Sequence, residues 1–213
     1  MKNKLEVAVN LLLGLAAITV LYGYVGGSGS SNSKSPSEEL EEEDWRFASR
    51  ESRSTIGNAG AKHRLVIFTD FQCPFCRDLH DRLDARERAR PGVVSVSILH
   101  YPIRSHKYAT DAAAAFECVK GDRLKRAIAD LLYEKQDSIG LIKMSEFAAR
   151  VGSSDASAFE QCVASTPAAI SAHFSFGEKL GIAATPTVLL DGRRLSGPPT
   201  DELLDRIYGA TAK

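Results

Sequence analysis

The chain lacks an excess of charge of either sign and has few cysteines. Its 213 residues include 27 lysines and arginines and 27 aspartates and glutamates, so the formal net charge is +0. This balance argues against binding through a basic surface, and we expect no nucleic-acid partner. Four cysteines are too few for a small disulfide-rich scaffold. Hydrophobic residues at 44% and charged residues at 25% exclude a wholly disordered chain and a polytopic membrane protein.

Long hydrophobic runs are also scarce, and the one exception lies near the N-terminus. Residues 7–25 contain no charged side chain and, at about 1.5 Å per helical residue, are long enough to cross a bilayer once. Lys2 and Lys4 precede this segment and no lysine or arginine follows before Lys34, which predicts a cytoplasmic N-terminus. We therefore interpret residues 1–25 as a transmembrane signal anchor. A cleaved signal peptide is the alternative.

Both interpretations place the rest of the chain outside the cytoplasm. We expect a single-pass protein of the cell membrane with its folded domain on the extracytoplasmic (periplasmic) side, where disulfides persist. Residues 26–44 are rich in glycine and serine and then in acids. This composition predicts a flexible acidic linker. The folded domain is then expected at residues 45–213.

The domain begins with the pattern of an α/β protein. Residues 64–70 read RLVIFTD, whose continuous apolar run is typical of a strand buried on both faces. A polar stretch with helical character follows and stops at Pro91. Residues 93–100 again have the composition of a strand. The economical arrangement is a β-α-β unit with two parallel strands.

The second half of the domain has a long helical region and a short β region. Signals between about residues 108 and 181 are all helical, which predicts a helical insertion. Strand character returns at residues 187–190 and continues after Asp191-Gly192, a dipeptide typical of a type I′ hairpin turn. A last helix is expected from Thr200.

A pair of cysteines stands between the first strand and the first helix of the domain. In Cys73-Pro74-Phe75-Cys76 the leading sulfur meets the free N–H groups and the positive end of the helix dipole, which favour a thiolate. We expect Cys73 to be the reactive atom. Cys76, one turn further, is expected to be shielded and to act as the resolving thiol, with Phe75 and Leu79 packed behind it.

Three separated stretches together resemble a known family. FTDFQCPFCRDLH, YPIRSH…AAAAFEC and GIAATPTVLLDG are similar to the DsbA-like thiol-disulfide oxidoreductases of the thioredoxin superfamily, over roughly residues 64–208. The resemblance implies an α/β thioredoxin fold with the helical insertion between its β-α-β half and its C-terminal hairpin. It also implies that Thr185 and a cis Pro186 bind substrate beside Cys73.

One position departs from the family pattern. Members of the superfamily commonly have a buried acid six residues before the first active cysteine, where it helps to move the proton of the second thiol. This position is Ile67 here. The nearest carboxylate in the sequence is Asp70, and whether it substitutes is open. The departure favours an oxidant over a fast reductase, because oxidation requires Cys73 to leave rather than Cys76 to lose its proton.

The other two cysteines, Cys118 and Cys162, lie on the apolar faces of predicted helices. We expect a structural disulfide between them, and a pair of inert buried thiols is the alternative. A zinc site is disfavoured because only Cys73 and Cys76 have ligand spacing, so we expect neither a metal nor a cofactor. His80 and His106 receive no catalytic role.

These observations together predict a membrane-tethered, extracytoplasmic thiol-disulfide oxidoreductase that oxidises the cysteines of exported proteins. By resemblance, its electrons pass to a quinone-linked membrane thiol oxidase of the DsbB or vitamin K epoxide reductase (VKOR) type. The same cysteine pair is also compatible with a reductase or an isomerase. A redox-inactive binding or chaperone module, in which the CPFC disulfide is structural, is a further alternative.

Overall fold

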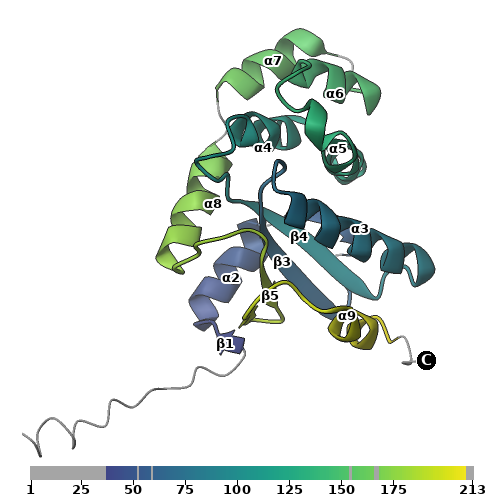
Figure 1. Ribbon diagram of the computed structural model, residues 1–213, viewed down its shortest axis with the longest axis vertical. Coiled ribbons are helices and arrows are strands. Elements are labelled where there is room, and N and C mark those ends of the chain that lie inside the picture. Colours follow the sequence, from purple (N-terminus) through teal and green to yellow (C-terminus); the bar gives the residue numbers. More distant parts are fainter. Residues whose placement is uncertain (1–36, 52, 59, 154, 166–167, 210–213) are drawn as a thin grey trace, which may run out of the picture. The chain divides into compact units, whose positions relative to one another are not determined.

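A computed structural model describes most of the chain after residue 36. The chain divides into two units, residues 1–35 and 36–213, and the described residues are 37–51, 53–58, 60–153, 155–165 and 168–209 (Figure 1). The predicted anchor at residues 1–25 and the first part of the predicted linker lie outside them and stay predictions. Within the described residues, no helix combines the length and the apolar character that a membrane span requires.

A six-stranded mixed sheet forms the centre of the domain, in the order β1-β6-β5-β3-β4-β2. Its middle strand, β3 (His63–Thr69), pairs in parallel with β4 (Val94–His100) and antiparallel with β5 (Thr187–Leu190). The side chains from Leu65 to Phe68 are all buried because helices cover both faces of this strand. The predicted β-α-β unit is confirmed.

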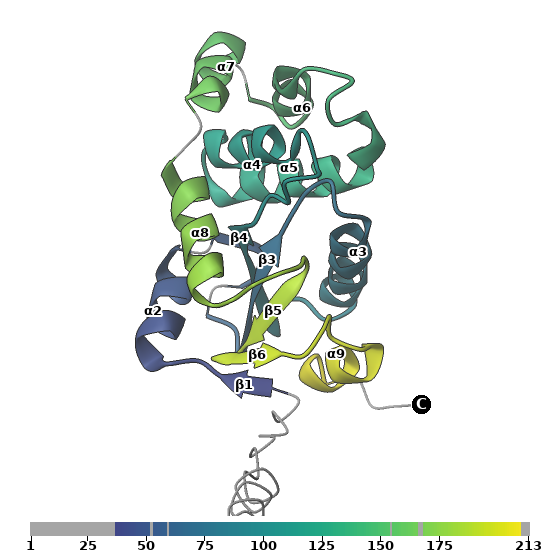
Figure 2. The same cartoon turned by 60° about the vertical axis from the view of Figure 1, so that its left-hand side comes forward.

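Helices cover the sheet as two outer layers. On one face, α3 (Pro74–Ala89) and α9 (Asp201–Ile207) pack on Ile67 and its neighbours. On the other face lie α2 (Glu42–Glu51) and α8 (Ala168–Lys179), which contact the alternate side chains of β3 (Figure 2). The C-terminal strands β5 and β6 (Arg193–Leu195) are joined at Asp191 and Gly192, with φ of 48° and 85°. Both angles are positive, as a type I′ turn requires.

The folded unit begins earlier than the sequence predicted. β1 (Ser37–Glu39) pairs with β6, and α2 starts at Glu42, whereas the predicted linker extended to Asp44. Acidic residues fill the first turn of α2, where the positive end of the helix dipole stabilises them. Asp44 also forms an ion pair with Lys179 of α8. The acids that indicated a solvated tether are therefore part of the fold.

A second strand was not predicted from the sequence. β2 (Arg53–Gly57) pairs antiparallel with β4 and forms the opposite edge of the sheet. Its pairing has an irregularity between Ser54 and Ile56. Its sequence, RSTIG, also lacks the alternation of polar and apolar residues that predicts a strand.

The predicted helical insertion is present between β4 and β5. Figure 1 shows the helices of the insertion that precede α8 at one end of the sheet, with α8 returning along the sheet. One hydrophobic cluster joins this region to the cysteine motif, since it contains Phe116 and Phe147 of the insertion together with Cys73 and Cys76. The elements preceding α8 are α4 (Ala109–Cys118), α5 (Asp122–Glu134), the 3-10 turn η1 (Gln136–Ser138), α6 (Met144–Arg150) and α7 (Ala156–Ala164).

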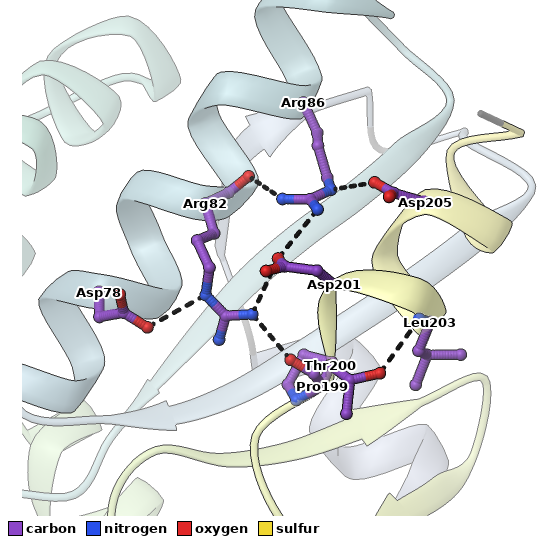
Figure 3. A network of polar contacts seen from close by, with 8 residues as sticks. All are labelled: Asp78, Arg82, Arg86, Pro199, Thr200, Asp201, Leu203 and Asp205. Carbon is purple, nitrogen blue, oxygen red and sulfur yellow. Dashed lines mark hydrogen bonds and ion pairs between the residues drawn. The ribbon is translucent and has the colours of Figure 1, made fainter. Parts of the chain in front are cut away.

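Polar contacts fasten α9 to α3 at the end of α3 remote from the cysteines. Arg86 donates to Asp201 at 2.9 Å and to Asp205 at 2.8 Å, and Arg82 donates to the carbonyl of Pro199 at 2.9 Å (Figure 3). Figure 3 also shows the Thr200 hydroxyl at the start of α9, where it accepts from the Leu203 N–H. These contacts fix the last helix on the sheet.

We expect Arg86→Ala to lower the free energy of unfolding by about 1–2 kcal/mol, because a largely buried guanidinium loses several hydrogen bonds and its packing. The Arg86 side chain is 19% exposed. Arg88, on the same helix, is 75% exposed and pairs with Asp84. Its alanine variant is the matched control and is expected to lose less than about 0.5 kcal/mol. Urea unfolding of both variants measures the difference, and equal losses would contradict a structural role for the Arg86 network.

Candidate active site

The two cysteines of CPFC lie where β3 runs into α3. Cys73 immediately precedes the helix, and its carbonyl accepts from the N–H groups of Cys76 and Arg77 at 3.1 and 3.2 Å. Pro74 occupies the first position of the helix, where no N–H is needed. Both cysteines are free thiols, with exposed fractions of 4% and 2%.

The two thiols have opposite acidities. A hydrogen bond from the Cys76 side chain lowers the pKa of Cys73 from 9.0 to about 5, against the opposing effect of burial. Thr185 and the backbone at Phe75 and Cys76 lower it further. Burial, followed by the interaction with Cys73, raises the pKa of Cys76 above its ordinary range. The pair therefore holds a thiolate at Cys73 and a proton at Cys76.

A loop from the other end of the domain faces the first cysteine. The Thr185-Pro186 peptide bond is cis, and the carbonyl oxygen of Thr185 lies 3.4 Å from the Sγ atom of Cys73. The fold thus brings together residues that the sequence separates by 112 positions. A backbone carbonyl of this loop therefore lies beside the sulfur of Cys73.

Asp70 fixes the loop that precedes the cysteines. One of its carboxylate oxygens accepts from the Gln72 N–H at 2.7 Å, and the other accepts from the Ile103 N–H and contacts His106 Nδ1, both at 2.8 Å. Asp70 is buried, with 2% of the residue exposed. The carboxylate therefore joins the loop before the cysteines to the loop that contains Ile103 and His106.

Gln136 is a site residue that the sequence analysis missed. It is buried in the turn after α5, and its side-chain amide donates to the carbonyls of Phe71 and Cys73 at 2.8 and 2.9 Å. These two bonds hold the cysteine loop against the helical insertion. A single glutamine at the end of a helix carries no signal of such a contact in the sequence.

The predicted position of Phe75 is wrong. Its side chain is 70% exposed, whereas Leu79 is buried as expected. The buried apolar residues of α3 are Cys76, Leu79 and Leu83, which lie three and four positions apart. Phe75 is out of phase with this stripe. Its aromatic ring is therefore exposed to solvent and is not packed behind Cys76.

The remaining cysteines are joined within the helical insertion. Cys118 at the end of α4 and Cys162 in α7 form a disulfide with a Cα–Cα distance of 5.8 Å. Both residues contact the cluster that contains the CPFC cysteines. In the part of the chain that the structure describes, no three histidine, cysteine, aspartate or glutamate side chains are grouped to hold a metal ion.

We expect the thiolate absorbance of the reduced protein to titrate with a midpoint near pH 5, which is the lowered pKa of Cys73. Because this pKa lies below its unfolded value, the thiolate stabilises the reduced fold, and this stabilisation is complete above pH 9.0. It decreases as the pH falls and is lost below about pH 5. A pH titration in the far ultraviolet measures the midpoint. The Cys73→Ser variant is the control and should lack the transition, and a midpoint near 9 would contradict the described electrostatics.

Comparison with known proteins gives the family. A family model described as thioredoxin matches residues 49–208, and the chain therefore belongs to the thioredoxin family. Part of the Na(+)/H(+) antiporter NhaA 1 of Mycolicibacterium gilvum is 29% identical over 148 residues, which are 67% of this chain and 24% of that protein. The chain thus spans about a quarter of the length of this curated relative.

Solved structures share the fold. BdbD of Bacillus subtilis superposes with a TM-score of 0.64 at 18% identity, covering 81% of this chain and 95% of that one. ScsC of Proteus mirabilis gives 0.66 at 19% identity, covering 96% and 95%. The α-DsbA1 of Wolbachia pipientis gives 0.59 at 18% identity, covering 72% and 89%. The predicted thioredoxin fold with a helical insertion before its C-terminal hairpin is confirmed.

Proposed function

We propose that this protein is a thiol–disulfide oxidoreductase that works through Cys73 and Cys76 and oxidises the cysteines of exported proteins. The observation that carries the proposal is the opposite acidity of the two thiols, with the pKa of Cys73 lowered to about 5 and that of Cys76 raised. Two structural thiols would have no need of such a difference. The nearby carbonyl of Thr185 supplies a place for the substrate backbone.

The proposed reaction transfers one disulfide to the substrate. In the oxidised enzyme a substrate thiolate attacks the Sγ atom of Cys73, the Cys73–Cys76 bond breaks, and Cys76 leaves with the electron pair and takes a proton. A second substrate thiol loses its proton and attacks the substrate sulfur of the mixed disulfide. Cys73 then leaves as a thiolate. The substrate has lost two electrons and two protons, and the enzyme has gained the electrons.

The acidity of Cys73 favours oxidation of the substrate. A thiolate that is stabilised in the reduced enzyme makes its disulfide easier to reduce, which raises the reduction potential. When the second substrate thiol attacks the mixed disulfide, the sulfur that leaves is this stabilised thiolate of Cys73. The apolar side chain of Ile67, which is 5% exposed, gives no acid for the deprotonation of Cys76 that a reductase needs.

The cellular setting is part of the proposal. The apolar segment at residues 7–25 would tether the domain to the membrane and keep it on the extracytoplasmic side. A quinone-linked thiol oxidase of the DsbB or VKOR type would then reoxidise Cys73 and Cys76. Tethering both proteins to one membrane raises their effective concentration for each other.

The reduction potential of the CPFC pair tests the direction of the reaction. We expect the full chain, held in mild detergent and equilibrated in glutathione buffers, to give a value nearer about −120 mV than about −270 mV. A value near about −270 mV would indicate a reductase instead. A potential below about −300 mV would make the disulfide structural and favour a binding or chaperone module. Substrate binding that survives loss of both cysteines would support that second candidate.

A further inference from the structure

Thr69 and Tyr133 form a buried pair of hydroxyl groups beside Cys76. The Oγ1 atom of Thr69, at the end of β3, lies 2.6 Å from the hydroxyl oxygen of Tyr133 on α5. Thr69 and Tyr133 are 3% exposed. Successive side chains of a strand alternate between faces, so Thr69 lies on the same face of the sheet as Ile67 and one pleat closer to the cysteines.

A small cavity connects these groups to the second thiol. It has a volume of about 10 Å³, which is near the lower limit for one water molecule. Ile67, Thr69, Cys76, His80 and Tyr133 are among its lining residues. Ile67, which stands where other members of the superfamily have an acid, therefore lines the same cavity as two hydroxyl groups and the thiol of Cys76.

The contacts have the order that a proton path requires. A hydrogen bond from the Thr69 side chain stabilises the thiolate of Cys76 and lowers its pKa, against the larger effect of burial. Either hydroxyl of the Thr69–Tyr133 pair has a geometry to donate to the other. When Tyr133 donates to Thr69, the Thr69 hydroxyl is directed to donate to sulfur. A continuous chain then runs from the cavity to Cys76.

We propose that Thr69 and Tyr133 relay a proton to and from the Sγ atom of Cys76 during thiol–disulfide exchange. This inference rests on the proposed function of the CPFC pair. Thr69 lines the same cavity as the Cys76 thiol, and Tyr133 acts through its hydrogen bond with Thr69.

The relay balances the first step of the reaction. As the substrate thiolate attacks Cys73, the Cys73–Cys76 bond breaks and its electron pair moves to the Sγ atom of Cys76. The proton of the Thr69 hydroxyl moves to this sulfur while the proton of the Tyr133 hydroxyl moves to Thr69. A water molecule in the cavity returns a proton to Tyr133, and bulk solvent returns one to the water. Reoxidation reverses the same transfers.

Several ionisable groups influence this path. Cys73 and Asp70 act on Tyr133 electrostatically, together with Cys76 itself. From α3, the His80 ring packs on the Tyr133 ring with 4.6 Å between centroids. His80 Nε2 also lies 2.9 Å from Asp130 Oδ1 on α5.

The test uses single turnovers of the oxidised full chain with excess dithiothreitol, followed by rapid quenching and thiol alkylation. We expect Thr69→Val to slow reduction of the Cys73–Cys76 disulfide by about 10- to 100-fold at neutral pH, at the lower end of the effect of a general acid. Tyr133→Phe should slow it by at least about fivefold. Thr69→Ser keeps the hydroxyl and should stay within about threefold of the unchanged chain.

The pH dependence separates a relay from a structural role. Hydronium protonates Cys76 directly at low pH, so the deficit of Thr69→Val should shrink as the pH falls toward about 5 and grow above neutrality. Tyr208→Phe is the matched control, because it removes a buried tyrosine hydroxyl near α9, at the other end of α3. Its rate should equal that of the unchanged chain.

Three results would overturn the relay. These are a Thr69→Val rate within about twofold of the unchanged chain at every pH, a deficit that does not vary with pH, or a failure of Thr69→Ser to restore the rate. If Thr69→Val does not fold, Tyr133→Phe decides by the same rate and pH criteria. A failure of the proposed function is distinguishable, because it would appear in the unchanged chain as a reduction potential of the CPFC pair near about −270 mV or lower, whatever the rates of the variants.

Discussion

Replacement of Cys73 by serine is expected to abolish the oxidation of a reduced dithiol protein, with a loss of more than about a thousandfold in rate. Serine has nearly the shape of cysteine but cannot form the disulfide that accepts the substrate's electrons. It also lacks the thiolate that hydrogen bonding from Cys76 stabilises. Oxidation of a reduced test protein by the preoxidised full chain, followed by counting of its free thiols, measures the loss.

Cys76→Ser is the matched control for this prediction. It leaves Cys73 free to form a disulfide with substrate, but it removes the thiol that would release the substrate by re-forming Cys73–Cys76. We therefore expect a mixed disulfide to accumulate in this variant and not in Cys73→Ser, visible on a non-reducing gel. If Cys73→Ser retained full dithiol oxidation, the mechanism proposed here would be wrong.

The second large effect is expected from loss of the disulfide in the helical insertion. Cys118 and Cys162 are 44 positions apart, and closure of such a loop stabilises a folded chain by about 4 kcal/mol in the chain-entropy model. The double variant Cys118→Ala with Cys162→Ala should lose about this amount of unfolding free energy. Urea unfolding of the oxidised protein measures it.

The same double variant tests how far the insertion supports the CPFC cysteines. The disulfide joins α4 to α7, while Gln136 holds the cysteine loop from the turn after α5. We expect the reduction potential of the CPFC pair to change little, because the contacts of Cys73 with Cys76 and Thr185 do not involve the disulfide. A loss of unfolding free energy below about 1 kcal/mol in the double variant would contradict a structural role for Cys118 and Cys162. So would an unfolding free energy of the unchanged chain that is the same before and after selective reduction of this disulfide.

Local patterns predicted the elements that carry the site. The apolar run of residues 64–70 requires burial on both faces, and it became the middle strand β3. The CPFC motif lies between that strand and a helix because Pro74 suits the first helical position. Asp191-Gly192 adopts the positive φ angles that its hairpin turn needs. Each of these features depends on residues that are close together in the chain.

Two differences between prediction and structure arose from weighting composition above position. Composition predicts a solvated tether up to Asp44, yet the acids from Glu42 to Asp44 lie in the first turn of α2, where they stabilise the helix. Phe75 was expected to be buried because it is hydrophobic, but its place on α3 is out of phase with the buried stripe. In both cases the sequence held the information, and the position along the helix decided.

The sequence by itself determined the family, the central β-α-β unit and the place of the CPFC motif between strand and helix, because these follow from local patterns and a continuous motif. Only the tertiary structure decided what surrounds the two sulfurs. Gln136 lies 63 positions from Cys73, Thr185 lies 112 positions from it, and Tyr133 lies 64 positions from Thr69. A contact between residues so distant in the chain leaves no local pattern, because the folding of the whole domain brings them together.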